Sequence, residues 1–177
     1  SFKEQIDQPD KVRFPTPSGR IELYSKQWAD ANDPLLPPVA KYIETWESRN
    51  DVLARKYPLQ LITTHVERRT HTQFETLPWL RELQRQEMLL NSADARSRNV
   101  ETGDMVRVFN DRGQIIIRAR VTERIMPGVV DVPQGAWYRP DSRGRDVGAN
   151  ANTLTRDECS PGGAFPYNTC LVQVEKA

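Results

Sequence analysis

The sequence is poor in residues that bind metals. Among its 177 residues there are two cysteines, Cys159 and Cys170, and two histidines, His65 and His71. The cysteines lack Cys-x-x-Cys spacing and no histidine lies near them, so a zinc or iron–sulfur site made by this chain alone is not expected. The two cysteines are interpreted as ordinary thiols, with a disulfide between them as the alternative.

The sequence also lacks an excess of charge and a long apolar run. Its 25 basic and 24 acidic residues leave a net charge of +1, so no long-range field favours nucleic acid or an acidic membrane surface as a partner. No stretch reaches the roughly 18 consecutive apolar residues of a membrane helix, and the first residues lack the pattern of a signal peptide. The chain begins at Ser1 without an initiator Met, which suggests a piece of a longer or processed polypeptide.

Apolar residues are few and unevenly distributed. They make up 37% of the chain, the mean hydropathy is −0.68, there are 13 prolines, and apolar residues concentrate after residue 57. We therefore predict an arm over residues 1–57 and one domain over residues 58–177. Within the arm, a hairpin-like strand is expected over residues 21–25, a short helix over 25–31 and a proline-rich connector over 33–38.

The domain contains short stretches of β-type sequence. In residues 105–109 and 114–121, apolar side chains alternate with polar ones, as in half-buried antiparallel strands. Further strands are expected at residues 59–64, 88–90, 129–132 and 171–174. Six short strands with two small helices predict a mainly β fold, in which a closed barrel leaves no strand edge unpaired.

Two local signals are expected to shape the connections. Thr76 is expected to cap a helix that begins with Pro78. The link from Asn110 to Gly113 contains Asn, Asp and Gly, which are typical of turns with positive φ.

Polar residues gather directly after the first predicted strand, in the segment Thr64–Gln73. The candidate binding residues of this segment are Thr64, His65, Arg69, Thr70, His71 and Thr72. Loops at strand ends collect ligand-binding groups, and an arginine, two histidines and hydroxyls offer donors for a pyrophosphate or a pterin edge. A solvated polar loop is the alternative, since two histidines are few for a metal site.

Asn91 and Asp94 lie at the start of a helix expected over residues 93–98. Asn91 or Ser92 can cap that helix, which is the simpler interpretation of both positions. Asn99, which tolerates a left-handed φ, is expected to end the helix. A carboxylate such as Asp94 can also accept the adjacent N–H donors of guanine.

Two further segments combine small and polar residues. Gly135 lies between Gln134 and Trp137, and a glycine beside an aromatic residue at a strand end permits the close approach of a flat ligand. A tryptophan buried in the core is the alternative there. Asn152 lies in the small-residue loop over 148–155, which is also typical of an ordinary turn.

Taken in order, these segments resemble one family. Thr64-His65, Arg69-Thr70-His71-Thr72, Asn91-Ser92-Ala93-Asp94-Ala95, Gln134-Gly135 and Asn152-Thr153-Leu154-Thr155 resemble the C-terminal dinucleotide-binding domain of molybdopterin oxidoreductases, nearest to the catalytic subunits of anaerobic dimethyl sulfoxide reductases. Ser92 stands where that family usually has proline, Thr72 where it has serine and Asn99 where it has glycine. The resemblance implies a six-stranded double-psi β-barrel with an extended N-terminal arm.

The resemblance also implies a cofactor and partners. The full subunit would hold molybdenum bis(molybdopterin guanine dinucleotide), which supports oxygen-atom transfer in anaerobic respiration, although this domain would fold without it. All the candidate residues named above would bind that cofactor, with Asn91 and Asp94 at the guanine, and this chain would hold no catalytic residue or metal ligand. Partners would be upstream domains of the same subunit, an iron–sulfur electron-transfer subunit and a membrane anchor subunit, without nucleic acid, at the periplasmic face of a bacterial membrane.

Functions of two other classes remain open from the sequence. A stand-alone double-psi barrel could bind protein or nucleic acid, although such a module needs neither the Thr64-His65 nor the Asn152-to-Thr155 segment. A small hydrolase could use His65 or His71 as its base, but no nucleophile motif accompanies them. Within the resembling family, a sulfoxide, an N-oxide or an oxyanion such as selenate are all open as the substrate.

Overall fold

The computed structural model describes residues 2–177, and the chain forms two compact units. The first unit extends to Ile43, and the second comprises Glu44–Ala177. The sequence predicted that the arm would end at residue 57, whereas the second unit already begins at Glu44. The reason is a set of hydrogen bonds, described below, that ties residues 44–57 to the barrel.

The first unit has little regular structure. It contains the helices α1 (Lys3–Asp7) and α2 (Lys26–Ala31), and α2 confirms the helix predicted there, with the Ser25 hydroxyl accepting a hydrogen bond from the Trp28 amide. The strand expected over residues 21–25 was wrong, since this segment has no strand partner and its apolar side chains are exposed. None of the helices in the described part of the chain is long and apolar enough to cross a membrane.

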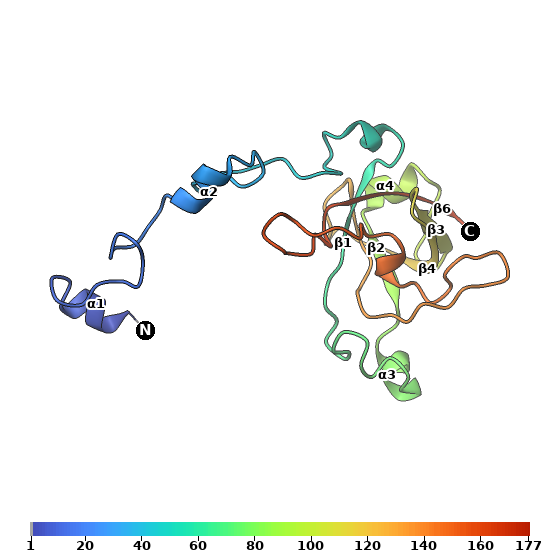
Figure 1. Ribbon diagram of the computed structural model, residues 1–177. Helices are drawn as coiled ribbons and strands as arrows, with labels where there is room; N and C mark the ends of the chain where they lie inside the picture. The colour runs from blue at the N-terminus through green and yellow to red at the C-terminus, as the bar shows by residue number, and fades with distance from the viewer. Residues whose placement is uncertain (1) are drawn as a thin grey trace. The chain divides into compact units, whose positions relative to one another are not determined.

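The second unit is built around a closed barrel of six strands in the order β1-β5-β2-β4-β3-β6 (Figure 1). Its elements are η1 (Val52–Arg55), β1 (Leu59–Ile62), α3 (Pro78–Leu83), β2 (Glu87–Leu90), α4 (Ser92–Arg96), β3 (Met105–Phe109), β4 (Gln114–Val121), β5 (Val129–Asp131), η2 (Ala151–Thr153) and β6 (Cys170–Lys176). The pairs β1–β5 and β2–β4 are parallel and the other four are antiparallel. The barrel confirms the mainly β, double-psi fold.

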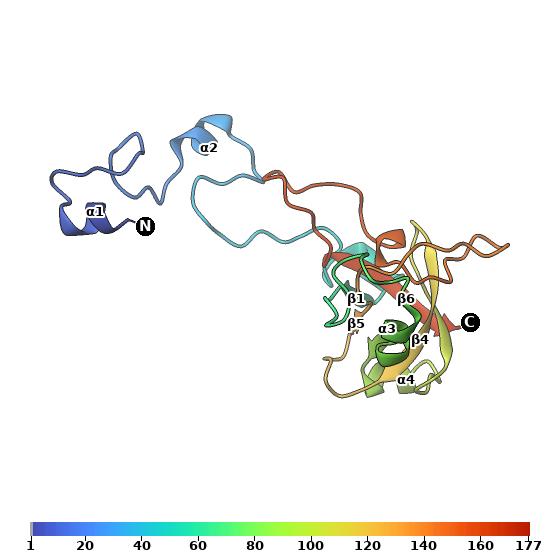
Figure 2. The same cartoon turned by 90° about the horizontal axis from the view of Figure 1, so that it is seen from below.

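The barrel interior holds the residues that the alternating pattern placed there. Val106 and Val108 of β3 and Ile115 and Ile117 of β4 are buried in one core cluster, because successive side chains of a strand point to opposite faces. β6 crosses the barrel beside β1 and closes it, as seen from below in Figure 2. The last strand therefore completes the barrel, as predicted.

The local helix and turn predictions had mixed outcomes. Asn91 caps α4 with its side chain, and Asn99 ends the turn after it with a φ of 54°, as predicted. Thr76 does not cap α3. The N-cap residue of this helix is Leu77, whose side chain makes no capping hydrogen bond. The prediction of positive φ angles between Asn110 and Gly113, in the link before β4, was also wrong. Gly113 is required there instead because a Cβ atom would collide with Thr153.

Glu47 fixes the start of the second unit to the barrel. Glu47 is 3% exposed as a residue, and its carboxylate accepts two hydrogen bonds from Arg112 at 2.6 and 2.8 Å and one from the Leu171 amide at 3.0 Å. Arg112 also donates to the Leu154 carbonyl and to Cys170 Sγ. Bidentate charge-assisted bonds of this kind are among the stronger polar contacts in proteins, so residues 44–57 belong with the barrel although their sequence is poor in apolar residues.

We predict that Glu47→Ala lowers the free energy of unfolding by about 2–3 kcal/mol, because Arg112 and the Leu171 amide lose a charged partner in a mostly buried place. Urea unfolding followed by fluorescence measures this. The control is Glu101→Gln at an exposed site, which should stay within about 0.5 kcal/mol of the parent chain. Equal stabilities of the Glu47 and Glu101 variants would contradict the role given to Glu47.

The cysteines are free, with Cys159 exposed and Cys170 buried, so the interpretation as two thiols is confirmed. Burial raises the pKa of the Cys170 thiol to about 11, although the neighbouring Arg112 charge lowers it. We predict that one thiol per chain reacts with a disulfide reagent at pH 8 and that the second reacts only on unfolding, since the thiolate is the reactive form. Mass spectrometry identifies the labelled residue, and fast native labelling of Cys170 would show that its site opens.

Candidate functional site

Strand direction determines which candidate segments meet at one end of the barrel. β1 and β5 are parallel, so Thr64 and Gln134, which follow these strands, emerge at the same end. The Gln134 amide donates to the Thr64 carbonyl at 3.0 Å. β2 runs antiparallel to β5, so Gln86, which precedes β2, also lies at this end.

Asp131 holds Thr64 at this end. The Asp131 carboxylate accepts the Thr64 amide at 3.1 Å and the Thr64 hydroxyl at 2.7 Å. Burial raises the pKa of Asp131 above its usual range, and the two hydrogen bonds from Thr64 lower it in part. Thr64 and His65 border a groove of about 890 Å³ that is also lined by Arg68, Arg120 and Arg124.

The loop after β1 docks on the loop after β5. Gly135 has a φ of 93°, and a Cβ atom there would collide with the His71 carbonyl. The Trp137 indole N–H donates to the Thr72 carbonyl at 3.0 Å. The close approach predicted at Gly135 is thus made by the chain's own backbone, and Trp137 is 49% exposed, so the alternative of a core tryptophan was wrong.

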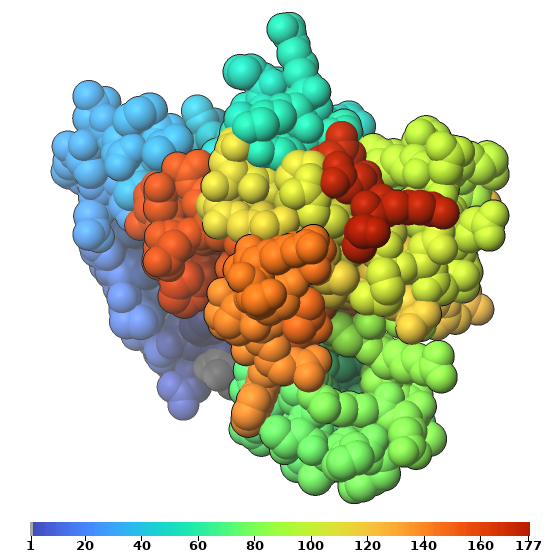
Figure 3. Space-filling model, turned by 90° about the vertical axis from the view of Figure 1, so that its right-hand side faces the viewer, coloured from blue at the N-terminus to red at the C-terminus, as the bar shows by residue number. Residues whose placement is uncertain are grey.

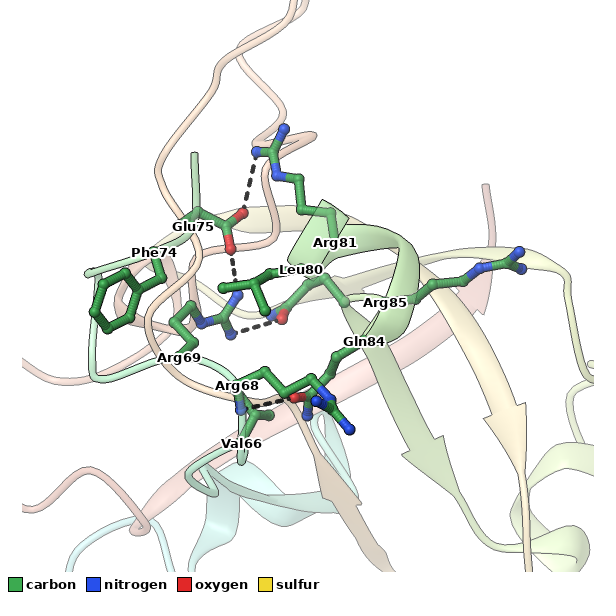
Figure 4. A pocket seen from close by; sticks show the side chains of 10 residues that line it. Val66, Arg68, Arg69, Phe74, Glu75, Leu80, Arg81, Gln84 and Arg85 are labelled. Carbon is green, nitrogen blue, oxygen red and sulfur yellow. Dashed lines mark hydrogen bonds and ion pairs between the residues drawn. The ribbon is translucent and has the colours of Figure 1, made fainter. Parts of the chain in front are cut away.

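Arg69 lies in the middle of a polar cluster that Figure 4 shows from close by. Its Nη1 pairs with Glu75 at 2.5 Å, and Glu75 also pairs with Arg81 at 3.2 Å. Its Nη2 donates to Gln86 Oε1 at 2.9 Å and to the Gln134 carbonyl at 2.6 Å. The side chains of Arg69 and Glu75 are only 9% and 10% exposed, so this ion pair is held in a place of low dielectric constant.

Asp146 shapes the third loop of this end, which carries Asn152. Its fully buried carboxylate accepts the backbone amides of Arg139, Gly148 and Asn150 at 2.7–2.8 Å, and the Thr153 hydroxyl at 3.2 Å. Asp146 was not among the residues that the sequence indicated. An aspartate two residues before a glycine and four before an asparagine is a turn-forming signal that could have revealed it.

Two buried donors at this end have no acceptor, Arg69 Nε and Gln134 Nε2. Such groups are rare in native proteins, because water or another partner normally satisfies them. Arg69 also lines a pocket of about 340 Å³, whose charged lining is Arg69, Arg81, Arg85, Arg118 and Arg139 with a single acid, Glu75. In Figure 3 the orange residues near 140 form a bulge between the yellow β3–β4 hairpin and the green residues around α3.

The remaining candidates are placed differently. Thr70, His71, Thr72 and Asn152 have exposed side chains, and the rings of His65 and His71 meet edge to face at 5.1 Å between centroids. Among residues 2–177, no three acidic, histidine or cysteine side chains come together as metal ligands would.

Asn91 and Asp94 do not join this cluster. They follow β2 at the end where Gly128 precedes β5, and the six steps along the chain from Gly128 to Gln134 span about 20 Å if extended. Asp94 accepts the Gly128 amide at 2.7 Å, and buried Asn91 donates to the Ile125 carbonyl at 2.7 Å. The structure therefore forms two polar clusters rather than one shared groove, because β2 and β5 are antiparallel.

A six-stranded barrel with three polar loops held at one end and buried donors left over defines a ligand-binding barrel. The family model described as the molydopterin dinucleotide binding domain matches residues 59–171. The chain belongs to this family.

Several bacterial reductases are similar to this chain over almost its whole length. Over 99% of its length it is 41% identical to dimethyl sulfoxide reductase DmsA of Escherichia coli and 39% identical to DmsA of Haemophilus influenzae, and it covers 23% of each. It is 37% identical to trimethylamine-N-oxide reductase 1 of Escherichia coli, of which it covers 22%. The chain thus spans about a quarter of the length of these relatives.

A solved structure shares the fold. Acetylene hydratase from Pelobacter acetylenicus superposes with a TM-score of 0.79 at 21% identity, over 96% of this chain and 25% of that chain. The donors present suit the family's ligand, since a dinucleotide has phosphate and carbonyl oxygens to which Arg69 Nε and Gln134 Nε2 can donate.

We predict a pH-dependent effect of Asp131→Asn. Burial raises the folded-state pKa of Asp131 above the unfolded value, so its stabilising contribution is present at low pH and is lost as the pH rises through the folded-state pKa. The variant, which keeps partners for Thr64, should therefore become more stable relative to the parent chain as the pH rises from about 3.5 to 7. Urea unfolding across this range measures the difference.

The matched control is Asp157→Asn, at an exposed aspartate, for which the difference from the parent chain should be nearly independent of pH. A pH-independent difference for Asp131→Asn as well would contradict the burial argument.

Proposed function

We propose that this chain is the cofactor-binding domain of a molybdenum oxidoreductase related to dimethyl sulfoxide reductases, and that it binds molybdopterin guanine dinucleotide. The observation that carries the proposal is the similarity to sulfoxide and N-oxide reductases along 99% of the chain. The two buried donors without acceptors support it from the structural side.

The residues of the chain would bind and orient the dinucleotide. Arg69 Nε and Gln134 Nε2 would donate to its oxygens, and Asp131 would keep the Thr64 hydroxyl and the following His65 at the edge of the groove. When bound, the molybdenum cofactor supplies oxygen-atom transfer coupled to two electrons.

The two polar clusters fit a ligand with two different ends. A dinucleotide is elongated, so the cluster around Arg69 can serve the pterin and phosphate part while Asn91 and Asp94 serve the guanine. Asp94 has one oxygen on the Gly128 amide and the other 3.7 Å from Arg98. Guanine binding would then compete with the contact between Arg98 and Asp94, which is long and therefore weak enough to be replaced.

The partners follow from the same proposal. Upstream domains of one subunit would complete the cofactor site, and an iron–sulfur subunit with a membrane anchor would deliver electrons. The periplasmic location stays a prediction. Neither His65 nor His71 has a hydrogen-bonded acid in the described chain, so no observation favours the hydrolase.

We predict that guanosine diphosphate binds the 177-residue chain weakly, with a Kd of roughly 1 mM, equal to about 4 kcal/mol, because one domain encloses only part of the ligand. Amide signals near Asn91, Asp94 and Gly128 should shift together in NMR titrations. Asp94→Asn keeps an acceptor for the Gly128 amide but removes the carboxylate, so it should abolish the preference for guanosine over adenosine diphosphate.

The control is Asp157→Asn, which should keep that preference. Equal shifts with both nucleotides in the parent chain, or no shifts with either, would refute guanine recognition by this cluster.

A further inference from the structure

Gln86 connects the three loops that gather at one end of the barrel. Its amide oxygen accepts Arg69 Nη2 at 2.9 Å, and its amide nitrogen donates to the Pro133 carbonyl at 2.8 Å and to the Ala149 carbonyl at 3.2 Å. One partly buried side chain therefore contacts the loop after β1, the loop after β5 and the loop that leads into η2.

The hydrogen bonds of Arg69 leave one of its three guanidinium nitrogens, Nε, without a partner. Nη1 of Arg69 is bound by Glu75, and Nη2 by Gln86 and the Gln134 carbonyl. Nε is buried and has no partner. A buried donor without an acceptor is costly, so its persistence at a ligand-binding end indicates a place kept for an acceptor from outside the chain.

The adjoining pocket has the charge of a diphosphate site. Arg69 lines it together with four other arginines and a single acid. In the described chain, the guanidinium groups of Arg85 and Arg139 make no hydrogen bond or ion pair, and Figure 4 shows the Arg85 side chain extending away from the Arg69 cluster. Guanidinium groups match phosphate oxygens in charge and geometry.

We propose that Gln86 is a positioning residue, which holds Arg69 so that its free Nε–H donates to a diphosphate oxygen of the ligand in the arginine-lined pocket. This inference rests on the proposed function and deepens it. Gln86 also lines this pocket, but both ends of its amide are already bonded within the protein, so it would act on the ligand through Arg69.

The test uses the 177-residue chain, inorganic diphosphate as the probe, and the ¹H–¹⁵N signal of Arg69 Nε. In the parent chain this signal should shift on titration with diphosphate. Gln86→Met retains the length of the side chain but removes all three hydrogen bonds, so it should displace the signal before any ligand is added and weaken diphosphate about tenfold.

A second variant separates the two roles of the amide. Gln86→Glu keeps an acceptor for Arg69 but cannot donate to Pro133 and Ala149, so the Arg69 signal should stay near its parent position while amides of residues 149–152 exchange faster with solvent. If Gln86→Met does not fold, this variant carries the test. Gln114→Met is the control, since Gln114 also accepts an arginine, Arg107 at 3.1 Å, and should change neither reading.

The possible failures are distinguishable. Gln86 variants with the parent Arg69 signal, the parent exchange rates and the parent diphosphate affinity would overturn the positioning role. An Arg69 signal that does not respond to diphosphate in the parent chain would overturn the ligand assignment. Neither result affects the nucleotide-induced shifts at Asn91 and Asp94. Those shifts are the test of the proposed function.

Discussion

Closure of the barrel is the constraint on which the second unit depends. β1 has only four residues, yet it pairs with β5 on one side and with β6 on the other, and so leaves no edge of the barrel open. A closed barrel with both parallel and antiparallel pairs also determines at which end each connection emerges. The loops after β1 and β5 meet for this reason, and the turn after β2 cannot join them.

The loops at the functional end lack regular structure, so side chains supply the hydrogen bonds that secondary structure would otherwise provide. Asp146 collects backbone amides of one loop, while Arg69 and Gln86 join that end's loops to one another. Buried polar networks of this kind are rigid when every member is satisfied. At this end Arg69 Nε and Gln134 Nε2 remain unsatisfied, and they are therefore the places where a ligand has most to contribute.

Side-chain hydrogen bonds also hold residues 44–57 to the barrel. Their sequence has few apolar residues to bury, and hydrophobic content alone assigned them to the arm. Glu47 has a positive φ of 54°, which is uncommon for this residue type, and its bonds to Arg112 and Leu171 hold that conformation. A contact between residues 65 positions apart cannot be read from local sequence patterns, so these patterns did not show that residues 44–57 pack with the barrel.

The sequence by itself determined the six strands of the barrel, the core and the family. Alternation placed Val106, Val108, Ile115 and Ile117 inside the barrel, and Asn91 capped its helix as its side chain suggests, because periodicity and capping are local properties. Only the tertiary structure decided that Asn91 lies far from Gln134 and that Gln86 lies between three loops. Those placements depend on strand pairing between distant residues, where direction and register, rather than local composition, determine which side chains become neighbours.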